Sequence, residues 1–472
     1  MAKNVELMGA VFPDCPAVLL PTHEGPLARF TDVSDSQAVA ADVAQGKQFY
    51  LADGTKATGT NQGGGGGGGG GTIKPNARLV LIDYDGSIVD SYTQSEIDAL
   101  SALPANPDHS GDEIPLTSQG WNWTLAEVKE QLTAMPEQTV WVGQTYIPTD
   151  GKTHIVIYID ENAPASRLAT TLRFTQSVNN GVTVDWGDGS APETFSGTSA
   201  AERNHTFARG GWLDVTLTVT SGTLRFDGAS NYSIFGNSGA NYTYRRGQIQ
   251  KVFLGSGLAT NGVGPFAFQY CTALASVTVP TGVTNIGNYA FRYCENLLAC
   301  VLPKGITTTG DGLFSYNHAF GRAAIPPDFP NIGGYTFQEC FRLEGTTILK
   351  KYTSFGSAIW ANCHMLTSIS IPAGVTMIGS SSLQNCYNLT SLTIPIGVTS
   401  IGTNAFGNDK GIAEYHFKPT TPPTLGAANV FNGIKSEAVI YVPYSEDHSI
   451  LHAYKTASNW SNYASQMVEE AE

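Results

Sequence analysis

Basic residues and long apolar runs are both scarce in this chain of 472 residues. Lys and Arg number 26 against 40 Asp and Glu, which gives a formal net charge of -14. An acidic surface repels polyanions, so neither nucleic acid nor an anionic membrane is an expected partner. No apolar run of about 18 residues occurs, and membrane insertion is not predicted. The first residues lack the uninterrupted apolar core of a secretory signal, since Glu6 and Asp14 interrupt them.

The sequence also lacks several common catalytic motifs. It contains no Cys-x-x-Cys pair, no Gly-x-Ser-x-Gly elbow and no phosphate-binding loop. We therefore expect no metal, no cofactor and no enzymatic activity. A carboxylate pair for glycoside hydrolysis stays open, because no feature of the sequence either promotes or excludes it.

The cysteines reveal a repeat. Five of the seven are separated by 23, 46, 23 and 23 residues: Cys271, Cys294, Cys340, Cys363 and Cys386. The gap of 46 is twice 23, and Asn317 occupies the skipped position. Because these cysteines share one repeat position, we interpret them as buried packing residues rather than a disulfide framework. At the same position the amide of Asn317 is expected to bond loop backbone.

Other positions follow the same period. One position is glycine in all seven copies: Gly264, Gly287, Gly310, Gly333, Gly356, Gly379 and Gly402. A bulky residue follows: Phe268, Phe291, Phe314, Phe337, Trp360, Leu383 and Phe406. The glycine suits either a turn with positive φ or a close backbone approach. Each copy then has a short alternating stretch, often ending in Pro as in "VTVP", which predicts one strand and a turn. Stacked copies would pair these strands in parallel and bury faces that one copy cannot bury alone.

The sequence of these repeats resembles that of the BspA-type leucine-rich repeats. Residues 249–412 hold seven copies, and the resemblance implies a solenoid with a sheet on its concave side. Two copies depart from the pattern, and irregular coils are expected there: "AAIPPDFP" is rich in Pro, and "TTILKKYTSFG" lacks the Pro that ends the strand. Residues 413–472, with "VIYVP" as a last strand followed by a helical stretch, are expected to cap the open end.

Nine consecutive glycines at 63–71 separate the N-terminal residues from the rest. Residues 61–76 are predicted to be a linker, and residues 1–60 a small β-rich module. Within that module "ADVAQGKQFYLADGTKATGT" resembles the openings of tail and fibre proteins of phages and prophages, which implies attachment to other virion proteins. Because so small a module and a glycine run are both more easily ordered by packing against copies of themselves, a homo-oligomer, most simply a trimer, is predicted.

The residues between the glycine run and the repeats predict two further parts. Residues 77–160 form a small α+β module, with helices in "QSEIDALSAL" and "TLAEVKEQLTAM" and then a hairpin turning at Asp150–Gly151. Residues 161–228 resemble a PKD-type β-sandwich through "GVTVDWGDGSAPETFSG", with a hairpin at Asp188–Gly189. The fold class is therefore mainly β and multidomain.

One motif suggests an enzyme. "LVLIDYDGSIVDS" (79–91) closely matches the first motif of haloacid-dehalogenase-type phosphatases, in which Asp83 would attack phosphorus and Asp85 would act as acid and base beside Mg²⁺. That chemistry also needs an α/β domain and a late acidic pair, which the sequence does not supply. The simpler interpretation is a hairpin that turns at Asp85–Gly86.

Two repeat columns are candidate binding surfaces. Residues just before the Cys position would form a ridge: Tyr270, Tyr293, Tyr316, Glu339, Asn362 and Asn385. Exposed aromatic rings are platforms for sugars, and neighbouring amides could bond their hydroxyls; the alternative is a structural stacking ladder. A second column, small and mostly uncharged, would line the concave sheet: Thr278, Val301, Ala324, Thr347, Ser370 and Thr393. Both suit carbohydrate or protein better than nucleic acid.

These features favour a structural protein of a phage virion. We expect a tail fibre, head fibre or other appendage, located in the virion, that presents the repeats to a host-surface glycan or protein. A bacterial cell-surface adhesin with the same repeats is the alternative, and a phosphatase is a remote one. A virion protein leaves the cell by lysis and needs no signal peptide, which favours the first hypothesis.

Overall fold

The computed structural model describes six short strands within residues 1–71 and, beyond them, residues 72–470 except 229–233, 236–246 and 331. The chain divides into two compact units, Met1–Gly70 and Gly71–Glu472. The first unit contains three antiparallel pairs: β1 (Val5–Leu7) with β2 (Ala10–Phe12), β3 (Ala17–Thr22) with β4 (Gly25–Thr31), and β5 (Gln48–Tyr50) with β6 (Lys56–Thr58). These strands agree with a small β-rich module, whereas the glycine run lies outside the described residues.

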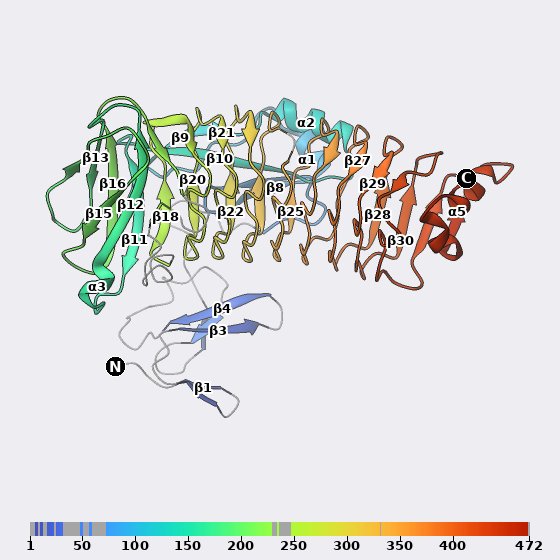
Figure 1. Ribbon diagram of the computed structural model, residues 1–472, viewed down its shortest axis with the longest axis horizontal. Coiled ribbons are helices and arrows are strands. Elements are labelled where there is room, and N and C mark those ends of the chain that lie inside the picture. The colour runs from blue at the N-terminus through green and yellow to red at the C-terminus, as the bar shows by residue number, and fades with distance from the viewer. Residues whose placement is uncertain are drawn as a thin grey trace. The chain divides into compact units, whose positions relative to one another are not determined.

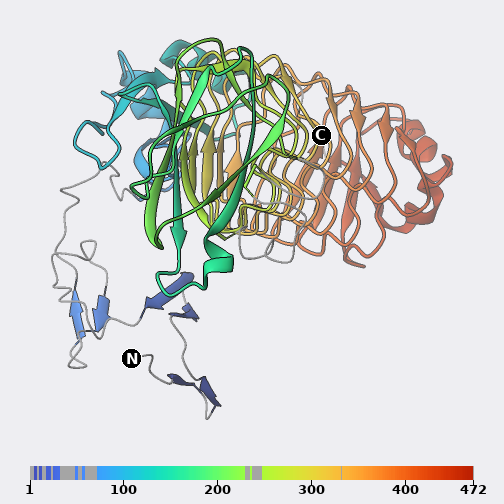
Figure 2. The same cartoon turned by 60° about the vertical axis from the view of Figure 1, so that its left-hand side comes forward.

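The second unit is dominated by a solenoid whose coils follow one another in Figures 1 and 2. Each coil but one contributes a strand to one of two successive parallel ladders, which together are here called the strand face. The first holds β18 (Ile249–Phe253), β20 (Ser276–Thr278), β22 (Ala299–Val301), β24 (Arg322–Ala324) and β25 (Gly345–Thr346), and the second holds β28 (Ser391–Ile394), β30 (Glu414–Phe417) and β32 (Val439–Val442). Thr278 pairs with Val301 and Val301 with Ala324, so one sequence period is one coil.

A second ladder of shorter strands runs along another side of the coils. It consists of β19 (Leu258–Val263), β21 (Asn285–Ile286), β23 (Thr308–Thr309), β26 (Ser354–Phe355), β27 (Met377–Ile378), β29 (Ser400–Ile401) and β31 (Thr424–Leu425). Its pairs are also parallel. The predicted solenoid of parallel strands is therefore confirmed.

The repeated glycines allow coils to approach closely. A Cβ on Gly402 would lie 2.4 Å from the backbone nitrogen of Ser380, and one on Gly287 would lie 2.2 Å from that of Pro265. Neither glycine has a positive φ. Close backbone approach, and not left-handed geometry, therefore explains the glycine column.

The bulky and cysteine columns fill the core between coils. Phe268 and Phe291 stack with ring centroids 5.5 Å apart, and Phe314 continues the stack at 5.8 Å. The six described cysteines are buried and outside any disulfide, and Cys363 Sγ donates to the Phe337 carbonyl of the preceding coil at 3.1 Å. The expected role of Asn317 is confirmed, because its Oδ1 accepts the Cys294 N–H at 2.7 Å.

The antiparallel strands before the solenoid continue its sheets. They are β11 (Thr153–Ile159), β12 (Ala169–Gln176), β13 (Val182–Asp185), β14 (Glu193–Thr194), β15 (Ala201–Thr206), β16 (Gly211–Val219) and β17 (Leu224–Phe226), with the short helix α3 (Ala165–Leu168). One sheet has the order β14-β13-β16-β11-β18-β20-β22-β24-β25, and the other has the order β15-β12-β17-β19-β21-β23. The sandwich and the solenoid therefore share both sheets and one core.

The α+β module contains four strands and two helices. They are β7 (Leu79–Ile82), β8 (Ile88–Tyr92), β9 (Leu116–Trp121), β10 (Val140–Pro148), α1 (Gln94–Ala99) and α2 (Leu125–Ala134). Both predicted helices are present, and each begins at a capping box, Thr93 with Glu96 and Thr124 with Glu127. The predicted β7–β8 hairpin at Asp85–Gly86 is confirmed.

The predicted hairpin at Asp150–Gly151 is wrong. The chain does turn there, but β10 pairs with β7 and β9, whereas β11 pairs with β16 and β18. Because both edges of β11 are occupied, it cannot also pair with β10. By its pairing β11 belongs with the sandwich and not with the 77–160 module in which the sequence analysis places it.

The C-terminal residues close the solenoid. β30 and β32 extend the parallel ladder into the predicted cap, and β33 (Met467–Glu469) pairs with β32, so "VIYVP" is not the last strand. The helix α5 (Ser449–Thr456) and the 3-10 helix η2 (Trp460–Gln466) bury Tyr454 and Trp460 against Phe417. Among the described residues, no helix combines the length and apolar character needed to span a bilayer.

Candidate binding surface

The three tyrosines of the predicted ridge stack on one another. The ring centroids of Tyr270 and Tyr293 are 4.6 Å apart, and those of Tyr293 and Tyr316 are 4.5 Å apart. The guanidinium of Arg292 lies 4.7 Å from the Tyr293 ring centre and 5.0 Å from that of Tyr316. Each ring is half-buried. The faces between neighbouring rings are therefore in contact, which is the geometry of a stacking ladder, and binding by this ridge stays a prediction.

The ridge continues as a ladder of hydrogen bonds. Asn362 Nδ2 donates to Glu339 Oε1 at 2.7 Å, and Asn385 Nδ2 donates to Asn362 Oδ1 at 2.6 Å. All six ridge residues have positive φ, between 60° and 65°. The column therefore marks a left-handed turn in each coil, a backbone requirement that favours Asn but also accepts Tyr and Glu here.

The α+β module covers the first coils of the strand face, which the sequence analysis expected to be an open concave surface. Thr278, Val301, Ala324 and Thr347 are at most 3% exposed. Val80, Ile82, Ile88 and Trp141 of the module form one apolar cluster with Ala299, Val301 and Ala324. For these coils the expectation is therefore wrong, because a part of the same chain occupies the surface.

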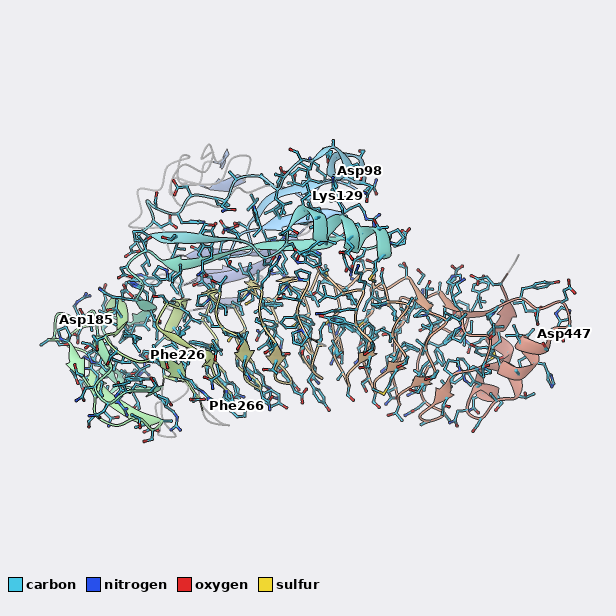
Figure 3. All side chains as sticks on the ribbon, turned by 90° about the horizontal axis from the view of Figure 1, so that it is seen from above. Asp98, Lys129, Asp185, Phe226, Phe266 and Asp447 are labelled. Carbon is cyan, nitrogen blue, oxygen red and sulfur yellow. The ribbon has the colours of Figure 1, made fainter. Side chains whose placement is uncertain are left out.

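Close packing between the module and the coils depends on small residues. A Cβ on Gly143 would lie 2.4 Å from a Val301 methyl, and one on Gly345 would lie 2.7 Å from Nε1 of Trp141. In Figure 3 the module, marked by Asp98 and Lys129, runs beside the coils and ends before the C-terminal ones.

Polar contacts fix the position of the module. Asn122 Nδ2 donates to the carbonyls of Leu302 and Ala324 at 2.9 and 3.0 Å, and Trp123 Nε1 donates to that of Ile325 at 2.7 Å. Lys304 and Glu127 form an ion pair at 2.7 Å. Because Asn122 and Trp123 are buried, these hydrogen bonds replace water that both partners would otherwise bind.

Beyond the module the strand face is accessible. Its outward side chains there, here called the open strand face, are Ser368, Ser370, Ser391, Thr393, Glu414, His416, Val439 and Tyr441. Thr393 is exposed and Ser370 is half-buried, whereas Leu392 and Ile394 point into the core. The rings of His416 and Tyr441 stack with centroids 4.8 Å apart. Of the predicted column, Ser370 and Thr393 thus remain uncovered, and the His416–Tyr441 pair lies beyond it on the same face.

A second ring ladder, which the sequence analysis missed, lies one residue beyond the Cys column. His318, Phe341, His364 and Tyr387 stack in succession with centroid distances of 4.6, 4.7 and 4.8 Å. Tyr387 is 42% exposed and the neighbouring Met365 is 50% exposed. These four ring-bearing residues follow one another at intervals of 23 in the sequence, and this spacing predicts the ladder.

The phosphatase motif forms a sealed structural cluster. Asp83 is fully buried, and its Oδ2 lies 2.8 Å from Nε2 of His109, whose Nδ1 lies 2.8 Å from Asp112. Burial lowers the pKa of His109, but the hydrogen bonds and charges of Asp83 and Asp112 outweigh it and raise that pKa. Asp85 accepts hydrogen bonds from the N–H and hydroxyl of Ser87 within the turn. A substrate phosphate therefore has no access to Asp83.

The conspicuous sandwich motif is also structural. Asp188 Oδ2 accepts from Ala208 N at 2.8 Å and lies 2.9 Å from Nε2 of His205, while His205 stacks on Trp186 at 4.3 Å. β13 and β14 pair around this turn, as the hairpin prediction requires. The likeness to PKD domains itself stays a prediction.

One pair of histidines has metal-ligand spacing, a signal that the expectation of no metal overlooks. His448 precedes α5 and His452 lies in it, and His448 Nδ1 is 2.6 Å from Glu469 Oε2. Within the described parts of the chain, however, no three His, Cys, Asp or Glu side chains converge as a metal site would require.

Comparison with known families supports the repeat assignment. Residues 240–367 and 321–413 match the BspA type leucine rich repeat region, in six copies. The array is of the BspA type. No curated protein matches the chain.

Three solved structures are similar in fold to this BspA-type array. A leucine-rich repeat protein of T. pallidum is 19% identical over 48% of this chain and 95% of that one, with a TM-score of 0.31. A leucine-rich repeat protein from Bacteroides ovatus is 16% identical over 44% and 75%, with a TM-score of 0.19. The pneumococcal vaccine antigen PcpA is 15% identical over 44% and 65%, with a TM-score of 0.31.

Proposed function

We propose that this chain is a non-enzymatic adhesion protein that contacts a surface glycan or protein through the open strand face. The observation that carries this proposal is the change in exposure along one repeat column. Val301, Ala324 and Thr347 are buried by the chain's own module, whereas Thr393, in the same column, is exposed. A ligand that lies across the coils could therefore contact only the C-terminal part of the strand face.

The chemistry of the open strand face suits a neutral, hydroxyl-bearing ligand. Serine and threonine hydroxyls both donate and accept hydrogen bonds, and the stacked His416 and Tyr441 present ring edges beside them. The carboxylate of Glu414 lies 3.4 Å from Nε2 of His416, and Glu470 lies 3.0 Å from its Nδ1, so the basic group is already paired. Such a surface carries no basic cluster of the kind that binds nucleic acid.

The biological setting is the second part of the proposal. The resemblance of the N-terminal sequence to tail and fibre proteins favours a virion fibre or appendage that attaches through residues 1–60 and assembles as a trimer. The match of the repeats to the BspA type is equally compatible with an adhesin on a bacterial cell surface. Immunogold labelling of phage particles and of cells from the source culture would distinguish the two, because each predicts label on only one of them.

Matched substitutions on one coil test the adhesion surface. Thr393→Lys places a charge on the open strand face, and Thr399→Lys places the same charge at an exposed position before the second ladder. We expect Thr393→Lys to reduce binding of fluorescent protein to intact cells at least tenfold and Thr399→Lys to leave it unchanged. Equal binding by both variants would show that the open strand face is not the contact surface.

A further inference from the structure

A small pocket lies where the module ends over the strand face. Its volume is about 160 Å³, and its walls come from the module around Trp141, from the coil of β25 and from the following coil around residues 366–370. The parallel ladder is interrupted there. One sheet ends at β25 and the next begins at β28, while residues 366–370 between them form no strand. The stretch "TTILKKYTSFG" (346–356), for which the sequence predicts irregularity, instead contains Thr346 of β25 and all of β26, and the strandless residues 366–370 lie in the next copy.

Two residues that line the pocket each have a buried polar atom without a hydrogen-bond partner. Trp360 is fully buried and Thr346 is 8% exposed, and neither the indole Nε1 nor the threonine Oγ1 has a partner. Both residues line the pocket. An unpaired buried donor destabilises the folded chain, so a ligand that reached both groups would gain from pairing with them.

Both residues break an apolar column of the repeat. The core-facing strand position is apolar or aromatic in the other coils: Val277, Cys300, Ala323, Ile369, Leu392 and Tyr415. Thr346 replaces it in this coil alone. At the bulky position Trp360 replaces the phenylalanine of five other coils. Packing alone requires neither the Thr346 hydroxyl nor the indole N–H, because residues without them, such as Val277 and Phe337, fill the same positions in other coils; Tyr415 also has a buried unpaired hydroxyl in the strand column.

The remaining lining defines the chemistry of the ligand. Ile348 and Leu366 supply apolar walls, Ser368 and Ser370 supply hydroxyls, and the pocket has no Lys or Arg among its lining residues. Two carboxylates, Glu137 and Glu344, also line it and disfavour an acidic ligand. Sites for drug-sized molecules occupy about 300–1,000 Å³, so this smaller pocket admits a single ring. A neutral pyranose combines an apolar ring face with hydroxyls that can accept from Trp360 and exchange hydrogen bonds with Thr346.

We infer that this pocket binds one neutral sugar residue, a hexose or N-acetylhexosamine, of a surface glycan. The inference deepens the proposed adhesion function and rests on it. It places the specific contact at the junction of the module and the solenoid, beside the open strand face. The module thus contributes part of the site as well as covering the preceding coils.

Saturation-transfer NMR on the full-length protein tests the inference. The probes are the methyl glycosides of glucose, galactose, mannose, N-acetylglucosamine and N-acetylgalactosamine, with N-acetylneuraminic acid as the acidic comparison. We expect at least one neutral glycoside to receive saturation and the acidic sugar to receive none. Absence of transfer to every neutral glycoside would overturn the inference.

Three substitutions assign the site. Trp360→Phe removes the indole N–H together with part of the ring, and Thr346→Val replaces the hydroxyl by a methyl. Other coils use both new residues at these positions, so both proteins should fold, and each should lose affinity about tenfold. Thr278→Val is the matched control, because its buried Oγ1 is also unpaired but lies outside the pocket. Unchanged affinity in both pocket variants would place the sugar elsewhere. Loss of cell binding in Thr393→Lys with normal cell binding in Trp360→Phe would retain the adhesion function and reject the pocket.

Discussion

Replacement of Asp409 by Asn should stabilise the protein, and the gain should grow with pH. Asp409 occupies the cysteine position of the last repeat and is fully buried. Its Oδ1 accepts the Cys386 N–H at 2.8 Å, and its Oδ2 has no partner. Burial raises the pKa of this carboxyl well above its usual range, and the single backbone hydrogen bond opposes the shift only in part.

The sign of the effect follows from the difference between the two states. Below about pH 4 the carboxyl is protonated in both the folded and the unfolded chain, and it contributes no penalty. Above that pH the unfolded chain releases the proton while the folded chain retains it, so stability falls by about 1.4 kcal/mol for each pH unit until the folded-state pKa is reached. Asn has no proton to lose and should remove this dependence.

The chain provides its own evidence that Asn fits. Asn317 occupies the same repeat position, and its Oδ1 accepts the Cys294 N–H at 2.7 Å as Asp409 accepts that of Cys386. Asp409→Asn should therefore keep the hydrogen bond. Asn317→Asp is the reciprocal change, and it should destabilise the protein at pH 7 but not at pH 4.

Urea unfolding of both variants and the parent at pH 4, 6 and 8 measures these effects. We expect the free energies of unfolding of Asp409→Asn and the parent to agree near pH 4 and to separate as pH rises. Parallel pH profiles for the two proteins would refute the argument, because they would mean that Asp409 ionises as readily in the folded chain as in the unfolded one.

Three further predictions concern the packing and assembly of the chain. Gly402→Ala should destabilise the protein by about 1–3 kcal/mol because its Cβ would lie 2.4 Å from Ser380 N, whereas Gly111→Ala, which has open space around it, should be neutral in thermal melts. The six described cysteines should not react with a thiol reagent in the native protein and should all react after unfolding without reductant; resistance after unfolding would indicate disulfides. A chain that begins at residue 72 should be monomeric by light scattering and the full-length protein trimeric, and a trimer without residues 1–71 would place the interface in the second unit.

Local periodicity predicted most of the solenoid. The 23-residue spacing of Gly, bulky and Cys positions identified the coils because each copy places the same side chain in the same environment, as the stacked Phe268, Phe291 and Phe314 show. The two helices of the module were also predicted, since capping boxes such as Thr124 with Glu127 are local in sequence. Pairing between distant strands was not predictable in this way. β11 has turn residues and an alternating pattern that suit a hairpin with β10, and only the available edges of β16 and β18 decide its partners.

The covered strand face shows why the candidate site was only partly predicted. A column of small, uncharged residues is compatible with a concave ligand surface and also with close packing of another element. Ala299 lies against Gly86 of the β7–β8 turn, Ala324 against Gly143 of β10, and Gly345 against Trp141, so each small residue accommodates a part of the module. The sequence of the solenoid alone cannot separate these cases, since the contacting residues lie more than 150 positions earlier in the chain. Thr346 and Trp360, by contrast, are detectable in the repeat alignment as polar substitutions in apolar columns.

The ends of the solenoid and the pocket face the same physical problem, because a parallel ladder that stops leaves backbone groups without partners. At the N-terminal end the antiparallel strand β11 pairs with β18, and at the C-terminal end β33 pairs with β32. Between β25 and β28, residues 366–370 form no strand, so the ladder is interrupted. Trp141 and neighbouring residues of the module line this gap and cover it only in part. The chain thus covers both ends of its ladder and the first coils of one face, and the sugar that we propose for the pocket would contact the chain at the internal break.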